Sequence, residues 1–104
     1  MDAELKPGIY IHGKVLSCTA NVYNRKDGSG QFVRVRHEIA TKPGTIEYEQ
    51  VLDPARDTGV KVEGGVLVAY PSIPEDTVVP LRVAPESIRE YKGKVRISRA
   101  ERVA

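Results

Sequence analysis

Residues 31–39, with the sequence QFVRVRHEI, alternate between polar and apolar side chains over almost their whole length. Successive side chains of a β-strand point to opposite faces of a sheet, so this alternation predicts a strand with one buried face. One face would carry Val33, Val35, His37 and Ile39, and the other Phe32, Arg34, Arg36 and Glu38. We therefore expect the valine face to pack in a core and the opposite face to meet solvent.

Similar runs recur along the chain, rich in Val, Ile, Tyr and Thr and separated by Gly, Pro, Asp and Asn, as is typical of strands and turns. The predicted strands cover residues 9–20, 32–41, 45–52, 60–70, 77–83 and 93–103, with Gly64 and Gly65 dividing the fourth run into two short pieces. The seven scattered prolines leave one helix candidate, residues 85–91, which is short and could equally be a loop. This pattern indicates one all-β domain, residues 1–104, of the small barrel or sandwich type.

The composition excludes several classes of protein. The single cysteine, Cys18, rules out an internal disulfide and a zinc knuckle. No apolar run approaches the roughly 18 residues that a membrane-spanning helix needs. The first residues lack the hydrophobic segment of a signal peptide. We therefore expect a cytoplasmic protein with no membrane association.

Charge is unevenly distributed. The net charge is +2 overall, but residues 81–104 hold seven basic and three acidic side chains. Such a basic stripe favours a surface that contacts an anionic partner, and a solvated, charged edge strand is the alternative interpretation.

The exposed face of residues 31–39 combines one aromatic ring with two guanidinium groups. An exposed ring is a stacking platform for an unpaired base, and arginine both pairs with phosphate and stacks on bases. Phe32, Arg34 and Arg36 are therefore candidate contacts for single-stranded nucleic acid. The alternative is that Phe32 turns into the core while the arginines pair with glutamates across the sheet.

Two other segments repeat this combination. Residues 24–30, NRKDGSG, place Arg25 and Lys26 in a glycine-rich turn, which predicts either a projecting hairpin arm or an ordinary tight turn. Near the C-terminus, the basic and aromatic side chains predicted to form a track for phosphates are Tyr91, Lys92, Lys94, Arg96, Arg99 and Arg102.

No catalytic arrangement emerges from the sequence. The two histidines, His12 and His37, have no metal-ligand spacing, and nothing local pairs either of them with Cys18. Glu47 and Glu49 share a strand face, an arrangement that is common on solvated sheets. We expect a protein that is not an enzyme and that binds neither a cofactor nor a metal.

Three segments together resemble the single-stranded DNA-binding (gene V) proteins of filamentous phages. Residues 25–32, RKDGSGQF, are similar to the DNA-binding wing of that family, and Arg34 follows where the family has another DNA-facing side chain. The resemblance implies that Phe32 stacks on bases and that Arg25 or Lys26 supplies the basic group.

The other two segments lie further along the chain. Residues 44–48, GTIEY, resemble a turn of the family whose exposed tyrosine lies near the contact between neighbouring dimers, a role that would fall to Tyr48. Residues 91–99 resemble a loop near the dimer axis and the final strand, with Tyr91 and Arg99 as DNA contacts. The chain departs from the family by extra length in residues 1–8 and 72–85, the latter near the family's dimerisation region.

The resemblance implies an OB-fold-type five-stranded Greek-key barrel with a projecting β-hairpin arm. It also implies sequence-independent, cooperative binding of single-stranded DNA by a homodimer during DNA replication. The predicted nucleic-acid-binding residues are Arg25, Lys26, Phe32, Arg34, Arg36, Tyr48, Tyr91, Lys92, Lys94, Arg96 and Arg99. The alternatives are a non-enzymatic β-barrel adaptor of a phage or mobile element, and a barrel that binds RNA.

Overall fold

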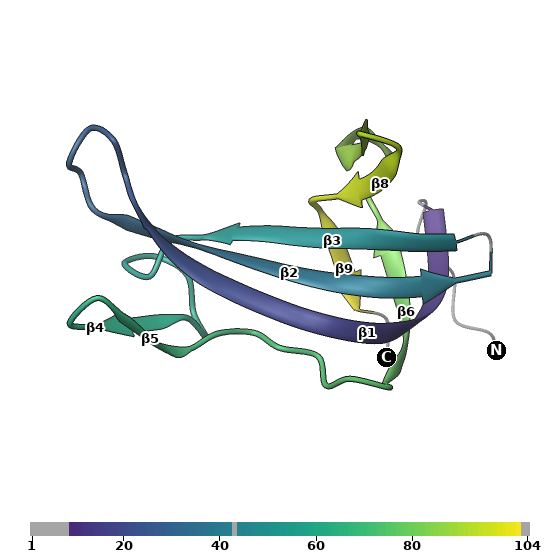
Figure 1. Ribbon diagram of the computed structural model, residues 1–104, viewed down its shortest axis with the longest axis horizontal. Coiled ribbons are helices and arrows are strands. Elements are labelled where there is room, and N and C mark those ends of the chain that lie inside the picture. Colours follow the sequence, from purple (N-terminus) through teal and green to yellow (C-terminus); the bar gives the residue numbers. More distant parts are fainter. Residues whose placement is uncertain (1–8, 43, 103–104) are drawn as a thin grey trace, which may run out of the picture.

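A computed structural model describes residues 9–42 and 44–102, which form an all-β fold (Figure 1). The strands are β1 (Ile9–Asn24), β2 (Gln31–Thr41), β3 (Gly44–Leu52), β4 (Lys61–Glu63), β5 (Val66–Ala69), β6 (Val78–Val83), β7 (Ile88–Tyr91), β8 (Lys94–Ile97) and β9 (Ala100–Arg102). One 3₁₀ turn, η1 (Pro85–Ser87), precedes β7. Within these residues, no helix is long and apolar enough to cross a membrane.

Seven of the strands form one sheet in the order β7-β8-β3-β2-β1-β6-β9, and β4 and β5 form a separate hairpin. All neighbours in the large sheet are antiparallel except β3 and β8, which run parallel. The large sheet thus has seven strands where the resemblance implied five. The difference arises because the last predicted strand is broken into β8 and β9, and because β7 is added at one edge.

The candidate segment over residues 85–91 forms neither a helix of that length nor a loop. Helical geometry extends only over Pro85–Ser87, and residues 88–91 pair with β8. The turn between β7 and β8 carries positive φ angles at Lys92 and Gly93, 51° and 79°. A left-handed turn of this kind suits a tight β-hairpin, and the resulting ladder of hydrogen bonds outweighs a weak local helical preference.

The sheet curls into a half-barrel because two segments of the chain each form hydrogen-bonded pairs with two different strands. Residues 9–14 of β1 pair with β6, whereas residues 14–24 pair with β2. Gly13 lies at this change of partner, where an added Cβ would collide with Ile39 Cγ2 and lie 2.8 Å from the carbonyl oxygen of Ala40. At the other side, residues 94–102 pair with β3 through β8 and with β6 through β9.

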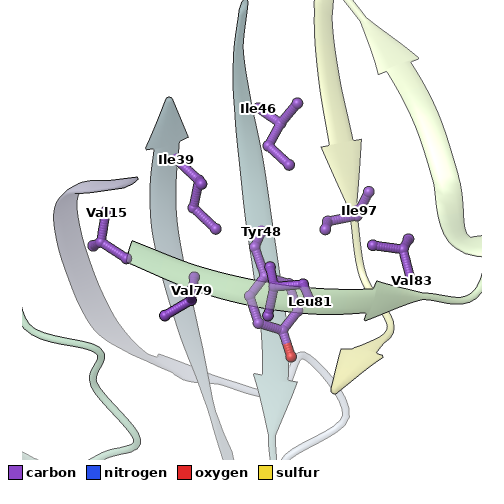
Figure 2. Close-up of a cluster of buried hydrophobic side chains, with 8 residues drawn as sticks. All are labelled: Val15, Ile39, Ile46, Tyr48, Val79, Leu81, Val83 and Ile97. Atoms are coloured by element: carbon purple, nitrogen blue, oxygen red, sulfur yellow. The ribbon is translucent and has the colours of Figure 1, made fainter. Parts of the chain in front are cut away.

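The main core fills the inside of this curl. It consists of Val15, Ile39, Ile46, Tyr48, Val79, Leu81, Val83 and Ile97 (Figure 2). A smaller cluster of Val33, Val35 and Val60 lies nearer the β4–β5 hairpin, against Val62 and Leu67. The alternation predicted for residues 33–39 is confirmed, since Val33, Val35, His37 and Ile39 are at most 1% exposed.

A β-bulge in β1 changes which side chains face outward. Val15 pairs with Ile39 and Ser17 pairs with Glu38, so Leu16 is an extra residue with no partner of its own. A bulge inserts one residue into the alternation and therefore reverses its phase downstream. Beyond the bulge, odd-numbered residues of β1 share the outward face, and Tyr23 is one of them.

His37 is the one buried histidine among the described residues. Its Nε2 accepts a hydrogen bond of 2.9 Å from the backbone N–H of Ile73, and its ring stacks on Tyr48 with the ring centroids 6.1 Å apart. Burial lowers the pKa of His37 below its usual value. The ring is therefore neutral, and its accepting nitrogen holds the segment that enters β6 against the barrel.

We predict that the protein loses stability as the pH falls from about 7 to about 5. The pKa of His37 is lower in the folded state than the value of about 6.5 expected when unfolded, so acid favours the unfolded chain. The contribution is complete above about pH 6.5 and is lost as the pH falls towards the folded pKa. Urea unfolding at several pH values measures how the free energy of unfolding depends on pH. His37→Gln should flatten the dependence in that range, whereas substitution of the exposed His12 by Gln should retain it.

Candidate nucleic-acid interface

Two aromatic rings lie side by side near the end of the long β1–β2 hairpin. Tyr23 and Phe32 are paired across the two strands, with ring centroids 5.2 Å apart and an angle of 17° between the ring planes. Their neighbours Val22 and Val33 point to the opposite, packed face. Tyr23 is 36% exposed and Phe32 is half-buried, so the ring of Phe32 lies on the outer face and not in the barrel.

Two guanidinium groups flank these rings. The Cζ atom of Arg25 lies 5.5 Å from the centroid of Phe32, and that of Arg34 lies 5.3 Å from Tyr23 and 6.0 Å from Phe32. Distances below about 6 Å are typical of cation–π contacts. Tyr23, Arg25, Phe32 and Arg34 thus form one group on the outer face, which we call the hairpin cluster.

The turn that ends the hairpin is held by its own backbone. The N–H of Arg25 donates to the carbonyl oxygen of Gly30 at 2.8 Å, and the N–H of Gly28 donates to the carbonyl oxygen of Arg25 at 3.1 Å. Hydrogen bonds from Ser29 to the carboxylate of Asp27 lower the pKa of Asp27. Lys26 is exposed at this tip, beside the hairpin cluster in sequence.

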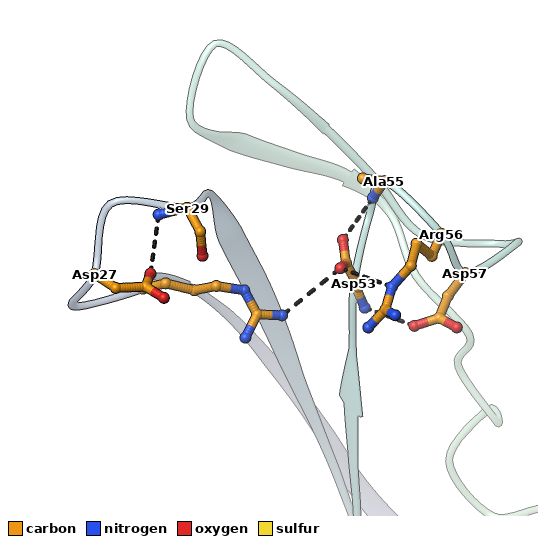
Figure 3. A network of polar contacts seen from close by, with 7 residues as sticks. Asp27, Ser29, Asp53, Ala55, Arg56 and Asp57 are labelled. Carbon is orange, nitrogen blue, oxygen red and sulfur yellow. Dashed lines mark hydrogen bonds and ion pairs between the residues drawn. The ribbon is translucent and has the colours of Figure 1, made fainter.

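Asp53 joins the hairpin to the loop after β3 (Figure 3). Its carboxylate lies 3.7 Å from Arg25 and 3.2 Å from Arg56, and accepts a hydrogen bond of 2.8 Å from the N–H of Ala55. The hydrogen bond from Ala55, followed by the pairing with Arg56 and Arg25, lowers the pKa of Asp53. Arg25 is therefore held near the sheet by a carboxylate that stays ionised.

A chain of ion pairs continues from the hairpin cluster across the outer face of β2, β3 and β8. Its members are Arg34, Glu49, Arg36, Glu47 and Arg96, and we call it the ion-pair ladder. Arg36 Nε lies 2.9 Å from Glu49 Oε2, and Arg96 Nε lies 2.9 Å from Glu47 Oε1. Arg34 Nε lies 3.6 Å from Glu49 Oε1, beyond hydrogen-bond distance. The alternative that the arginines pair with glutamates across the sheet thus holds for Arg36 by a direct hydrogen bond and for Arg34 by a longer ion pair, whereas Phe32 does not turn into the core.

Tyr48 does not occupy the exposed position that the resemblance implied. Its side chain lies among the core residues (Figure 2) and is 7% exposed. Its hydroxyl donates a hydrogen bond of 3.0 Å to the carbonyl oxygen of Ala100. Burial raises the pKa of Tyr48. Because Glu47 and Glu49 face outward, the alternation of the strand turns the residue between them into the core. Tyr48 is therefore a core residue and not a surface contact.

The remaining predicted residues lie away from the hairpin cluster. Figure 1 places β8 and the β1–β2 turn at opposite ends of the molecule. Lys92 and Lys94 are exposed at the β7–β8 turn, and Arg99 Nη2 lies 2.9 Å from Glu86 Oε1. The side chain of Tyr91 lies outside the part of the chain that the structure describes. The structure thus unites Arg25, Phe32 and Arg34 and joins Arg96 to them through the glutamates of the ion-pair ladder. It does not bring Lys92, Lys94 or Arg99 to the hairpin cluster.

Tyr23 belongs to the site although the sequence analysis did not select it. The expected strand ended at residue 20, three residues before Tyr23. The signal was available in the turn itself, because a hairpin closed around residues 25–30 places Tyr23 opposite Phe32.

Within residues 9–42 and 44–102, no group of three or more His, Cys, Asp or Glu side chains is arranged to hold a metal ion. Comparison with known protein families, with curated proteins and with solved structures gives no match for this chain.

Proposed function

We propose that this protein binds single-stranded DNA without sequence preference and does no chemistry on it. The observation that carries the proposal is the hairpin cluster, in which the exposed ring of Tyr23 and the half-buried ring of Phe32 stack on the outer face, flanked by two guanidinium groups. Every base has a flat face, so a ring platform accepts any sequence once the bases are unstacked. In a duplex the bases are already stacked on each other, so the platform favours single strands.

The arginines of the hairpin cluster supply the second part of the interaction. Guanidinium groups pair with phosphate oxygens, and each phosphate neutralised in this way releases counterions from the strand. Both are loosely paired, because Arg25 lies 3.7 Å from Asp53 and Arg34 lies 3.6 Å from Glu49, whereas Arg36 approaches Glu49 at 2.9 Å. Lys26 extends the positive charge beyond the rings.

The connectivity supports an OB-fold-type barrel. When residues 94–102 are counted as one broken strand, they run parallel to β3 and antiparallel to β6, while β1 pairs with both β2 and β6. OB-folds are five-stranded Greek-key barrels that bind oligonucleotides through the loop between their first two strands, among other loops. The hairpin cluster adjoins the corresponding loop here. We also propose, from the phage-family resemblance, a cytoplasmic homodimer that coats single strands cooperatively in DNA replication.

Titration of the protein into fluorescently labelled oligo(dT), read by anisotropy, tests the proposal. We expect binding with an occluded site of about 4–16 nucleotides per domain and an affinity that falls steeply with salt. Competition by a duplex of equal length should be weak, and comparison with poly(U) decides between DNA and RNA. If neither polymer binds at low salt, the proposal is wrong and the adaptor alternative is favoured.

A further inference from the structure

We propose that Glu47 and Glu49 confine the phosphate-binding surface to the hairpin cluster by neutralising Arg36 and Arg96. This inference rests on the proposed function. The outer face carries arginines along β2 and β8 that would otherwise continue a positive track from the hairpin to the C-terminal strands. The carboxylates of β3 lie between these arginines and divide the face into a cationic end and a neutral end.

The distances and burial support this division. Glu47 and Glu49 side chains are 13% and 11% exposed, unusually enclosed for carboxylates on an outer face. Each makes its shortest ion pair, 2.9 Å, with an arginine of the neutral end: Glu49 with Arg36, and Glu47 with Arg96. The corresponding distance to Arg34 of the hairpin cluster is 3.6 Å, so this arginine is the least engaged of the three.

Strand register fixes the position of the boundary. Arg36 lies directly opposite Glu49, and Glu38 lies opposite Glu47, so a third carboxylate is added at the neutral end. Arg34 lies opposite the uncharged Val51. The pairing of β2 with β3 therefore places a carboxylate opposite Arg36 and opposite Glu38, but none opposite Arg34.

Displacing these carboxylates is costly for a ligand. A phosphate that pairs with Arg36 must separate it from Glu49, leaving a largely enclosed carboxylate without its partner. Arg34 and Arg25 are held less closely, because their distances to a carboxylate are 3.6 Å and 3.7 Å. A phosphate can therefore pair with them at a lower cost. The expected result is a short site, with phosphates held near the rings and excluded from the sheet beyond them.

The test replaces Glu49 by the nearly isosteric glutamine. We expect Glu49→Gln to increase oligo(dT) affinity about tenfold at low salt. The slope of log K against log salt should steepen by about 0.7 for each arginine that gains a phosphate. The occluded site size should also increase. Glu101→Gln is the matched control: it changes the net charge equally and removes a carboxylate that pairs with Arg82, away from the hairpin cluster, so its effect on affinity should stay below about twofold.

The two variants decide the inference. Equal effects of Glu49→Gln and Glu101→Gln would show that only net charge matters and would overturn it. Weaker binding by Glu49→Gln would also overturn it, because the carboxylate would then position Arg34 for the ligand. If Glu49→Gln does not fold, Glu47→Gln is compared with the same control.

Glu49→Asp keeps the carboxylate and should therefore retain the wild-type slope of log K against log salt. Failure of the wild-type protein to bind oligo(dT) is a separate result that rejects the proposed function itself.

Discussion

Replacing Phe32 with alanine is expected to weaken oligo(dT) binding by about 1–3 kcal/mol, roughly 5- to 150-fold, the usual contribution of a base–aromatic stack. The free energy of unfolding should change much less, because the ring packs on the outer face against Tyr23 and not among the buried valines. Anisotropy of labelled oligo(dT) measures the affinity, and urea unfolding measures the stability.

Tyr23→Ala should have an effect of the same sign, since the two rings form one platform. The losses in the double variant should not add, because residues in direct contact share their interaction energy. Tyr70→Ala is a suitable control: Tyr70 is also exposed, at 38%, but follows β5 and lies outside the hairpin cluster. Unchanged binding by Phe32→Ala, or an equal loss with Tyr70→Ala, would mean that the hairpin cluster is not the binding surface.

The paired rings of Tyr23 and Phe32 show which part of the site could be predicted from the sequence. The regular alternation of residues 31–39 placed Phe32 and Arg34 outside and the valines inside, and the structure agrees. Tyr23 escaped this reasoning because the predicted strand ended at residue 20, whereas β1 extends to Asn24. The extra residue Leu16 also reverses the phase of β1 ahead of Tyr23. A bulge has little signature in composition, so the phase beyond it becomes visible only when the strand pairing is known.

The pairing of Arg96 with a carboxylate depends on contacts that no local sequence pattern predicts. Its partner Glu47 lies on β3, and the two meet because β8 runs parallel to β3 after a long intervening segment. Parallel pairing of distant segments leaves no periodic signal in the sequence. The same pairing turns a predicted phosphate contact into a member of the ion-pair ladder.

Tyr48 illustrates a different kind of error. Here the local alternation contained the answer, since a residue flanked by two outward glutamates must point inward. The likeness of residues 44–48 to an exposed family turn favoured the opposite orientation. The alternation gave the correct orientation because successive side chains of a strand point to opposite faces, whatever family the segment resembles.

Tyr48→Ala is therefore expected to lower the free energy of unfolding by about 3–5 kcal/mol, the usual effect of removing a buried aromatic side chain. The ring is 7% exposed and packs in the main core (Figure 2). Tyr48→Phe keeps the ring and removes only the hydrogen bond to Ala100, so its cost should be about 1 kcal/mol. Urea unfolding of both variants measures these changes.

Affinity separates the two interpretations of Tyr48. A core residue affects binding only through folding, so Tyr48→Phe should bind oligo(dT) as tightly as the wild-type protein wherever both are fully folded. A direct contact would lose affinity in Tyr48→Ala even under conditions where the variant stays folded. If folded Tyr48→Ala loses affinity for oligo(dT), Tyr48 is part of the nucleic-acid interface. Such a loss would also require the barrel to open there, because the described ring has little exposed surface to offer a base.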